Sequence, residues 1–338
     1  MQAGKQLEIG WACEHEQFQP DVLLDHAVAA DRAGFEFVWT SDHFHPFAHT
    51  GAAGGFAWSW MTALAERTRK IKIGTSVTCP SFRYHPAIVA QAFATMDRLY
   101  PGRIQLGVGT GEPLNELPLG FEWPPIPTRI ERLREAVQII RNLWTGEWVN
   151  LNGKFWKLKK AKLYTPPSSK IPIYIAAGGP KMAETAGSIG DGIICTPVFG
   201  LDQKYCNETL FPAFEKGARN SGKDPSTLDR IAELWVSYDE DYEKALKSTR
   251  FWAGSLLPFV FTHAVGDPRD IEFYGNYVGD EQMEKNWCVG PDIDKHINLL
   301  KSALKTGFNK IYIIASSPDM LKTIKVYERE VLPALRSK

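Results

Sequence analysis

The sequence predicts one (β/α)8 barrel, a TIM barrel, over its 338 residues. Short β-branched runs alternate with longer helical patterns, which is typical of βαβ units and a parallel sheet. Eight such runs with intervening helices favour a closed barrel over an open doubly wound sheet, and barrels often exceed about 250 residues as one domain. The expected strands are 7–13, 35–42, 70–79, 103–111, 171–179, 192–197, 230–239 and 310–317.

Four of the intervening stretches carry apolar residues at the spacing of about 3.6 that is typical of an amphipathic helix. They are residues 22–34, 85–102, 128–146 and 292–307. The first of them ends at Gly34, and glycine is the residue that most often follows a helix.

Three further segments do not belong to a bare barrel. Residues 148–164 alternate around Asn152-Gly153, which predicts a β-hairpin inserted before the fifth strand. Residues 112–127 are rich in proline and resemble a loop, and residues 256–291 form a long segment with weak periodicity. Long loops in a compact domain are usually functional, so we expect these segments to wall a site. No linker or second domain is indicated.

The composition excludes several classes of partner. The chain has 39 basic and 39 acidic side chains, so no net field favours nucleic acid or an anionic membrane. No window approaches the roughly 18 apolar residues of a membrane span, and the first residues lack the apolar core of a signal peptide. Five widely spaced cysteines without a CxxC pair argue against a disulfide framework or a zinc site. We therefore expect a cytoplasmic protein that binds small molecules and no metal.

The ends of the predicted strands carry the candidate catalytic residues, because active sites of such barrels lie at the C-terminal face. Residues 14–16 (Glu-His-Glu) follow the first strand, residues 41–43 (Ser-Asp-His) the second, and Glu112 the fourth. Histidine and carboxylates at one rim are typical of a general acid/base site. The structural alternatives are an Asp-His hydrogen bond at a strand end and a helix-capping role for Glu112.

Two glycine-rich loops suggest where a cofactor binds. The run 107–112 (GVGTGE) lacks the third glycine of GxGxxG, which argues against a nicotinamide dinucleotide site. Residues 177–179 (Ala-Gly-Gly) follow the fifth strand and open a helix, where free backbone N–H groups can hold a phosphate. A tight turn without a ligand is the alternative for this second loop.

Five runs of sequence form a recognisable set. They are 40–46 (TSDHFHP), 74–96, 100–116, 174–180 (YIAAGGP) and 249–254 (TRFWAG). These runs resemble the F420-dependent dehydrogenases of the luciferase-like superfamily, which include glucose-6-phosphate and secondary alcohol dehydrogenases. The resemblance covers nearly the whole chain. It implies a luciferase-like barrel, usually a homodimer, with the deazaflavin coenzyme F420 in a cleft at the strand ends.

The same resemblance implies a role for individual acid and base residues. His43 is similar to the base that takes the hydroxyl proton, Glu112 to the acid beside N1 of the deazaflavin, and Glu16 to a second active-site carboxylate. Asp42 matches a residue at the polar edge of the ring. Chemistry agrees with this, because oxidising an alcohol sends a hydride to C5 of the deazaflavin while the hydroxyl proton needs a base such as imidazole.

Further coenzyme contacts follow from the resemblance. Ser76 and Val77 correspond to a non-prolyl cis peptide behind the ring. The expected contacts to the ring or ribityl chain are Thr110 and Gly111, and those to the phosphate are Ala177, Gly178 and Gly179.

The substrate pocket departs from that of the sugar-phosphate enzymes. Where those enzymes carry phosphate-clamping basic residues, this chain aligns Phe199, Phe273 and Asn286. Phe47 stands where a tryptophan is common, and Trp235 adds an aromatic wall. We therefore expect a small secondary alcohol as substrate.

Several alternatives stay open at this point. Trp252 is a further candidate for the pocket wall, whereas Lys204 and Lys285 lie in the two loop regions and leave a rebuilt anion site possible. A sugar or sugar-6-phosphate dehydrogenase is therefore the first rival. The others are an FMN-dependent monooxygenase of the same superfamily and a non-catalytic F420 carrier, against which His43 and Glu112 argue.

Overall fold

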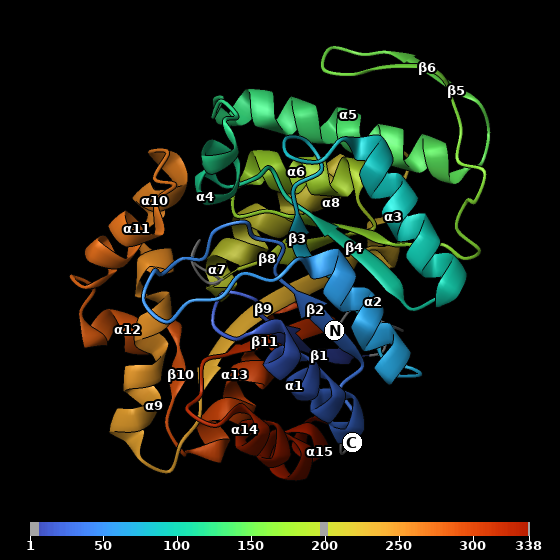
Figure 1. Ribbon diagram of the computed structural model, residues 1–338. Coiled ribbons are helices and arrows are strands. Elements are labelled where there is room, and N and C mark those ends of the chain that lie inside the picture. The colour runs from blue at the N-terminus through green and yellow to red at the C-terminus, as the bar shows by residue number, and fades with distance from the viewer. Residues whose placement is uncertain (1–6, 197–201, 337–338) are drawn as a thin grey trace.

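The computed structural model describes residues 7–196 and 202–336, and within them the chain forms a closed parallel barrel surrounded by helices (Figure 1). The sheet order is β10-β9-β11-β1-β2-β3-β4-β7-β8, and an additional β9–β8 pairing closes the ring. All eight predicted strands are present. They are β1 (Glu8–Cys13), β2 (Phe37–Thr40), β3 (Lys72–Thr78), β4 (Ile104–Val108), β7 (Ile173–Ala176), β8 (Gly192–Cys195), β9 (Asp229–Ser237) and β11 (Lys310–Ala315).

The four predicted amphipathic helices are also present, with boundaries within a few residues of those expected. Gly34 and Gly307 end two of them with φ of 88° and 109°, in the left-handed region that favours glycine. The helices outside the segments 112–127 and 256–291 include α1 (Pro20–Ala33), α2 (Ala57–Arg67), α3 (Pro86–Leu99), α5 (Ile126–Trp144), α6 (Pro180–Ile189), α8 (Phe211–Asn220), α9 (Tyr242–Thr249), α13 (Ile293–Thr306), α14 (Met320–Val326) and α15 (Leu332–Arg336).

A β-hairpin lies against α5, within the segment where the sequence predicts one (Figure 1). Its strands are β5 (Val149–Asn152) and β6 (Lys157–Ala161), which pair antiparallel. The Glu135 carboxylate of α5 accepts hydrogen bonds from the backbone N–H groups of residues 154–156. This carboxylate therefore ties the tip of the hairpin to the helix.

The segment 256–291 is more regular than its sequence indicates. It folds as α10 (Pro258–Thr262), α11 (Pro268–Gly275), α12 (Asp280–Asn286) and β10 (Cys288–Val289), which adds to β9 in parallel. Each of these helices has at most eight residues, which is too short for a 3.6-residue period to show. The 112–127 segment likewise contains a short helix, α4 (Pro113–Glu116), and a short helix α7 (Gln203–Tyr205) follows β8.

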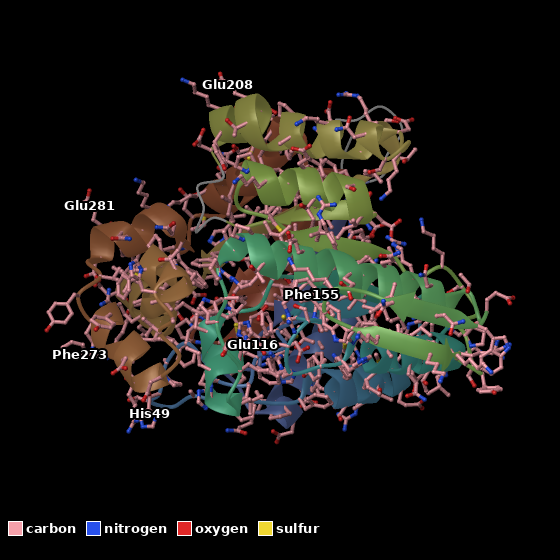
Figure 2. The ribbon with its side chains drawn as sticks, turned by 90° about the horizontal axis from the view of Figure 1, so that it is seen from above. His49, Glu116, Phe155, Glu208, Phe273 and Glu281 are labelled. Atoms are coloured by element: carbon pink, nitrogen blue, oxygen red, sulfur yellow. The ribbon has the colours of Figure 1, made fainter. Side chains whose placement is uncertain are left out.

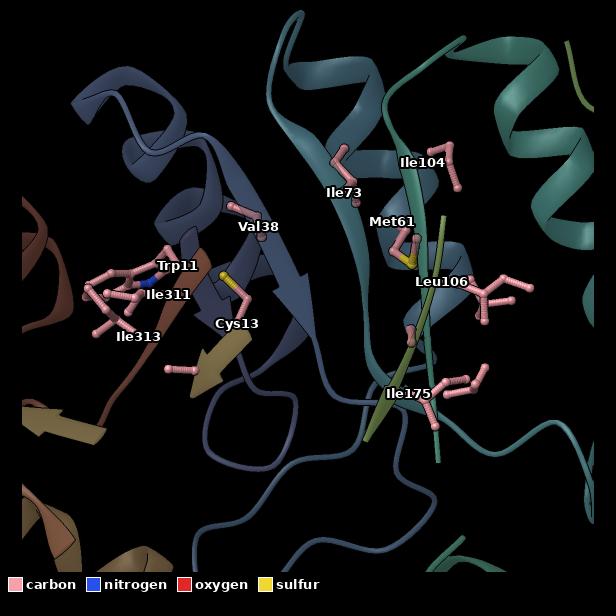
Figure 3. Packing of buried hydrophobic residues seen from close by; sticks show 14 of the residues in the cluster. Trp11, Cys13, Val38, Met61, Ile73, Ile104, Leu106, Ile175, Ile311 and Ile313 are labelled. Atoms are coloured by element: carbon pink, nitrogen blue, oxygen red, sulfur yellow. The ribbon is translucent and has the colours of Figure 1, made fainter. Parts of the chain in front are cut away.

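The apolar core has two parts, one between strands and helices and one inside the barrel. Figure 3 shows the outer part, in which Trp11, Val38 and Ile313 are buried between β-strands and helices. Inside the barrel, Trp39 donates from Nε1 to Gln105 Oε1 at 2.7 Å. Gly10 is required there, because a Cβ at this position would lie 2.3 Å from the Phe37 ring. Side chains therefore fill this part of the barrel interior.

Within the described ranges, no helix is long and apolar enough to span a bilayer. In those same ranges, no group of three or more His, Cys, Asp or Glu side chains is arranged to hold a metal ion.

Helices α6 and α8 approach each other closely over two glycines, and α6 carries the glycine loop of the site described below. A Cβ at Gly187 would lie 1.9 Å from the Phe214 carbonyl oxygen, and a Cβ at Gly217 would lie 1.9 Å from the Glu184 carbonyl oxygen. The backbones therefore touch where any larger residue would separate the helices.

We predict that Gly187→Ala lowers the free energy of unfolding by about 1–3 kcal/mol, the usual cost of overpacking. Helix propensity favours alanine by about 1 kcal/mol, so a net loss reports the clash with α8. Urea denaturation measures it. Gly54→Ala is the control, because this glycine lies outside the helices and the nearest atom to its added Cβ would be the Phe44 carbonyl oxygen at 3.7 Å, an ordinary contact. Equal stability of both variants would contradict the predicted clash.

Candidate active site

A cavity of about 900 Å³ opens at the C-terminal ends of the strands and collects most of the predicted site residues. Its volume falls in the range of roughly 300–1,000 Å³ that is usual for small-molecule sites. The predicted residues that line it are Asp42, His43, Phe47, Ser76, Val77, Thr110, Gly111, Glu112, Ala177, Gly178, Gly179, Trp235 and Trp252. Strand ends far apart in the sequence thus contribute to one site.

His43 lies between two carboxylates at the centre of the cavity wall. Its Nδ1 is paired with Glu16 Oε1, and its Nε2 lies 3.1 Å from Glu112 Oε2. Glu16 is 1% exposed and sits behind the imidazole, whereas Glu112 is 28% exposed and faces the cavity. Ser41 Oγ donates to Glu16 Oε2 at 2.7 Å and accepts the backbone N–H of His15 at 2.9 Å. Glu16 is therefore held in place on the side away from the cavity.

The two carboxylates decide the protonation of His43. Burial lowers the pKa of His43, but Glu16 and Glu112 outweigh burial and hold it well above its usual value. Burial raises the pKa of Glu16, and the neighbouring His43 reverses that shift and leaves it below its usual value. Both shifts favour an ion pair between a Glu16 carboxylate and a His43 imidazolium, whose proton could exchange with a ligand.

Asp42 is fixed from three sides. Its carboxylate accepts from Thr78 Oγ1 at 2.6 Å, from Tyr84 OH at 2.9 Å and from Arg83 Nη2 at 3.1 Å. Arg83 also pairs with the buried Glu116 at 3.3 Å. Sequence reasoning did not single out Arg83, which lies within the run 74–96 but is not at a strand end.

The floor of the cavity holds a hydrogen-bonded group that sequence reasoning missed. Glu233 Oε1 accepts from Thr196 Oγ1 at 2.9 Å and from Trp235 Nε1 at 2.6 Å, and Glu233 Oε2 accepts from Tyr312 OH. Ser76 Oγ lies 2.7 Å from the same Tyr312 hydroxyl. Burial raises the pKa of Glu233 although its three donors oppose that shift. The sequence could have indicated Glu233, because side chains alternate between the two faces of a strand and Glu233 therefore shares a face of β9 with Trp235.

The backbone around the cavity has the features that the resemblance implies. The peptide bond between Ser76 and Val77 is cis. Gly111 has φ +86°, and a Cβ there would lie 2.9 Å from Cys79 Sγ, so glycine is required. Gly179 caps the N-terminus of α6, and a Cβ at this position would meet no atom within 4 Å. The helix N-terminus therefore faces open space in the cavity.

Aromatic side chains line the end of the cavity next to His43. Phe47 lies edge-on to the His43 ring at 5.3 Å between centroids, and 6.2 Å and 5.9 Å from the rings of Trp252 and Phe261. Phe261 also lines the cavity, although sequence reasoning did not name it.

Two predicted pocket residues are not there. Phe273 is 55% exposed on α11 and projects from the edge of the molecule (Figure 2), because the buried face of this helix carries Ile271 and Gly275. Asn286 is absent from the cavity lining, and its amide donates to the Gln282 carbonyl of the same helix. Both predictions were wrong, since neither side chain lines the cavity. Phe199 lies outside the described residues.

Basic side chains line a different part of the cavity. Lys204 and Lys285 are exposed and do not line it. In the described part of the chain, the lysines and arginines that do so are Arg129, Arg134 and Lys181, on α5 and α6. Arg134 Nη2 donates to Thr185 Oγ1 of α6 at 2.8 Å. Arg134 and Lys181 therefore lie with the glycine loop, whereas Arg129 is close enough to Glu112 to interact with its charge.

Comparison with known proteins agrees with this geometry. The luciferase-like monooxygenase family matches residues 7–310. The chain belongs to this family. It is 43% identical over 333 residues to an F420-dependent glucose-6-phosphate dehydrogenase of Rhodococcus hoagii (strain 103S), covering 98% of both chains.

Two solved structures are similar over nearly their whole length. One is an F420-dependent secondary alcohol dehydrogenase in complex with an F420-acetone adduct, with 39% identity, a TM-score of 0.94 and coverage of 98% of this chain and 100% of that chain. The other is the coenzyme F420-dependent tetrahydromethanopterin reductase of Methanopyrus kandleri, with 25% identity, a TM-score of 0.80 and coverage of 97% and 99%.

The protonation of His43 can be tested without any ligand. We predict that NMR titration of the imidazole nitrogens places the pKa of His43 above about 6.5 and that of His15, which burial lowers, below it. Glu16→Gln should lower the pKa of His43, because one of its two carboxylate partners loses its charge. Glu131→Gln, at an exposed pair with Lys154, is the control and should change nothing. An unchanged His43 pKa in Glu16→Gln would contradict the ion pair.

Proposed function

We propose that this protein is an F420-dependent alcohol dehydrogenase that takes a hydride from a small alcohol. The observation that carries the proposal is His43, held between Glu16 and Glu112 at the aromatic end of a cavity whose other end is a glycine loop on a helix N-terminus. Relatives named as F420-dependent dehydrogenases of glucose 6-phosphate and of secondary alcohols support it.

The cavity residues fit a deazaflavin with a phosphate-bearing tail. Backbone N–H groups at Gly178 and Gly179, at the start of α6, would hold the phosphate, since a helix N-terminus favours an anion. Ala177 is a further proposed contact to the phosphate, and the proposed contacts to the ring and ribityl chain are Asp42, Ser76, Val77, Thr110 and Gly111. All of these residues line the cavity. When bound, the deazaflavin would supply the hydride acceptor.

His43 would move the proton. In alcohol oxidation the neutral imidazole accepts the hydroxyl proton, and Glu16 stabilises the imidazolium that results. Because the pKa of His43 is raised, oxidation should become faster as pH rises through that pKa, and ketone reduction should become slower. Glu112 would act as the acid beside N1 of the ring.

The charge around His43 favours a neutral substrate over a phosphosugar. Glu112 and Glu233 line this end of the cavity, and Glu16 lies directly behind the imidazole. The lysines and arginines that line the described part of the cavity lie on α5 and α6, and the His43 imidazolium is already paired with Glu16. A phosphate dianion at this end would therefore lose its solvation with little opposite charge in return. The sugar-phosphate alternative rests on relatives named as glucose-6-phosphate dehydrogenases.

A homodimer, a single domain over residues 1–338 and a cytoplasmic location also remain proposals that come from the sequence alone.

For the coenzyme, we predict that the purified protein binds F420 more tightly than FMN in a fluorescence titration, with NAD(P) weaker still. Gly178→Trp should weaken F420 binding far more than it changes the KM for the alcohol, because the indole would fill the phosphate loop. FMN binding equal to or tighter than F420 binding would favour the monooxygenase alternative.

For the substrate, we predict that F420 is reduced with 2-propanol and little or not at all with glucose 6-phosphate. An unpaired buried anion costs more than a misfitting methylene, which changes binding by only about 1–3 kcal/mol. Steady-state kcat/KM values for the two substrates decide this, and an equal or higher value for glucose 6-phosphate would support the sugar-phosphate alternative.

For the base, we predict that His43→Ala lowers kcat by about 10²–10⁴ while F420 affinity stays nearly constant.

A further inference from the structure

Glu14 occupies a position in the barrel that the proposed reaction does not use. Alternate residues of β1 point inward, so that Ala12 belongs to the inner core and Glu14 follows it at the cavity floor. The Glu14 side chain is only 9% exposed, and it lines the same cavity as His43. Its Oε1 is buried and has no hydrogen-bond partner among the described residues.

The surroundings of Glu14 differ from those of the neighbouring Glu233. The Glu233 carboxylate is saturated by Thr196, Trp235 and Tyr312. Around Glu14, by contrast, Ser41 is a hydrogen-bonding neighbour, and the principal charges acting on the carboxyl group come from Glu16, Glu233 and His43. Burial first, and then Glu16 and Glu233, raise the pKa of Glu14 well above its usual range. Burial and the neighbouring carboxyl groups thus favour the protonated form of Glu14, which can donate a hydrogen bond.

We propose that Glu14 binds a second hydroxyl group of the substrate, so that the preferred substrate class is a neutral diol or polyol rather than a monohydric alcohol. The inference rests on the proposed function, because it assumes that His43 and the cavity oxidise an alcohol.

A protonated carboxyl matches a hydroxyl group chemically. It donates one hydrogen bond and accepts another, as a hydroxyl does, whereas a phosphate offers only acceptors and carries charge. Phe47, Trp252 and Phe261 would contact the carbon chain, and His43 the reacting hydroxyl. A monohydric alcohol would leave the buried Glu14 unpaired, and sites built to bind a hydroxyl discriminate strongly against analogues that lack it.

The second hydroxyl does not react in this scheme. The reacting carbon would give its hydride to the deazaflavin and its hydroxyl proton would pass to His43, so that the C–O bond would become a carbonyl. The product is therefore a hydroxyketone that keeps its second hydroxyl on Glu14.

The test compares 2,3-butanediol with 2-butanol, which differ by one hydroxyl, in the F420-loaded enzyme. Wild-type kcat/KM should be higher for the diol. Glu14→Leu should lower kcat/KM for the diol roughly 10–100-fold and leave that for 2-butanol within about threefold, as expected for one lost hydrogen bond. Glu14→Gln should retain most of the preference because an amide also donates and accepts. Thr262→Val, at the exposed edge of the cavity, is the control and should not change the ratio.

Three outcomes would overturn the inference, and they can be told apart. Equal wild-type kcat/KM for both alcohols would remove the diol preference and leave the proposed function intact. An equal loss on both alcohols in Glu14→Leu, or weaker F420 binding by fluorescence, would show that Glu14 serves the reaction or the coenzyme instead. No F420 reduction by any alcohol would end the proposed function and this inference with it. If Glu14→Leu does not fold by circular dichroism, the wild-type substrate pair and Glu14→Gln still decide.

Discussion

The pairing of His43 with Glu16 is the interaction on which the arrangement of the site depends. A buried imidazolium is costly unless an anion compensates for its lost hydration, and Glu16 at 1% exposure provides that compensation. Ser41 in turn holds Glu16 in position. The ends of β1 and β2 must therefore lie side by side for the acid/base group to exist, and the parallel pairing of these strands achieves this.

The barrel also divides its cavity into two chemically different ends. The α6 end offers backbone N–H groups and the side chains of Arg134 and Lys181, whereas the end beside His43 offers carboxyl groups and aromatic rings. Charge of opposite sign on the two sides orients an elongated ligand with an anionic tail, because reversing it would place the anion against Glu112 and Glu233. The close contact of α6 with α8 keeps the glycine loop at the right place.

The polar side chains in the barrel interior are arranged in a continuous hydrogen-bonded chain. Ser76, the first residue of the cis peptide, forms a hydrogen bond with Tyr312. The Tyr312 hydroxyl donates to Glu233, which also accepts a hydrogen bond from the Trp235 indole. Through these contacts the wall behind the proposed coenzyme site and the aromatic wall of the pocket share one support. Glu14 is not part of this hydrogen-bonded series, and its Oε1 has no hydrogen-bond partner among the described residues.

The sequence by itself determined the eight strands, the helix ends at Gly34 and Gly307 and the strand-end position of His43, because these depend on short-range periodicity and backbone preference. Only the tertiary structure decided which side chains meet across distant segments. It turned Phe273 outward and Phe261 inward, since the direction of a short helix is set by what it packs against. It also set the protonation of His43 and Glu14, because a pKa depends on burial and on charges contributed by other strands.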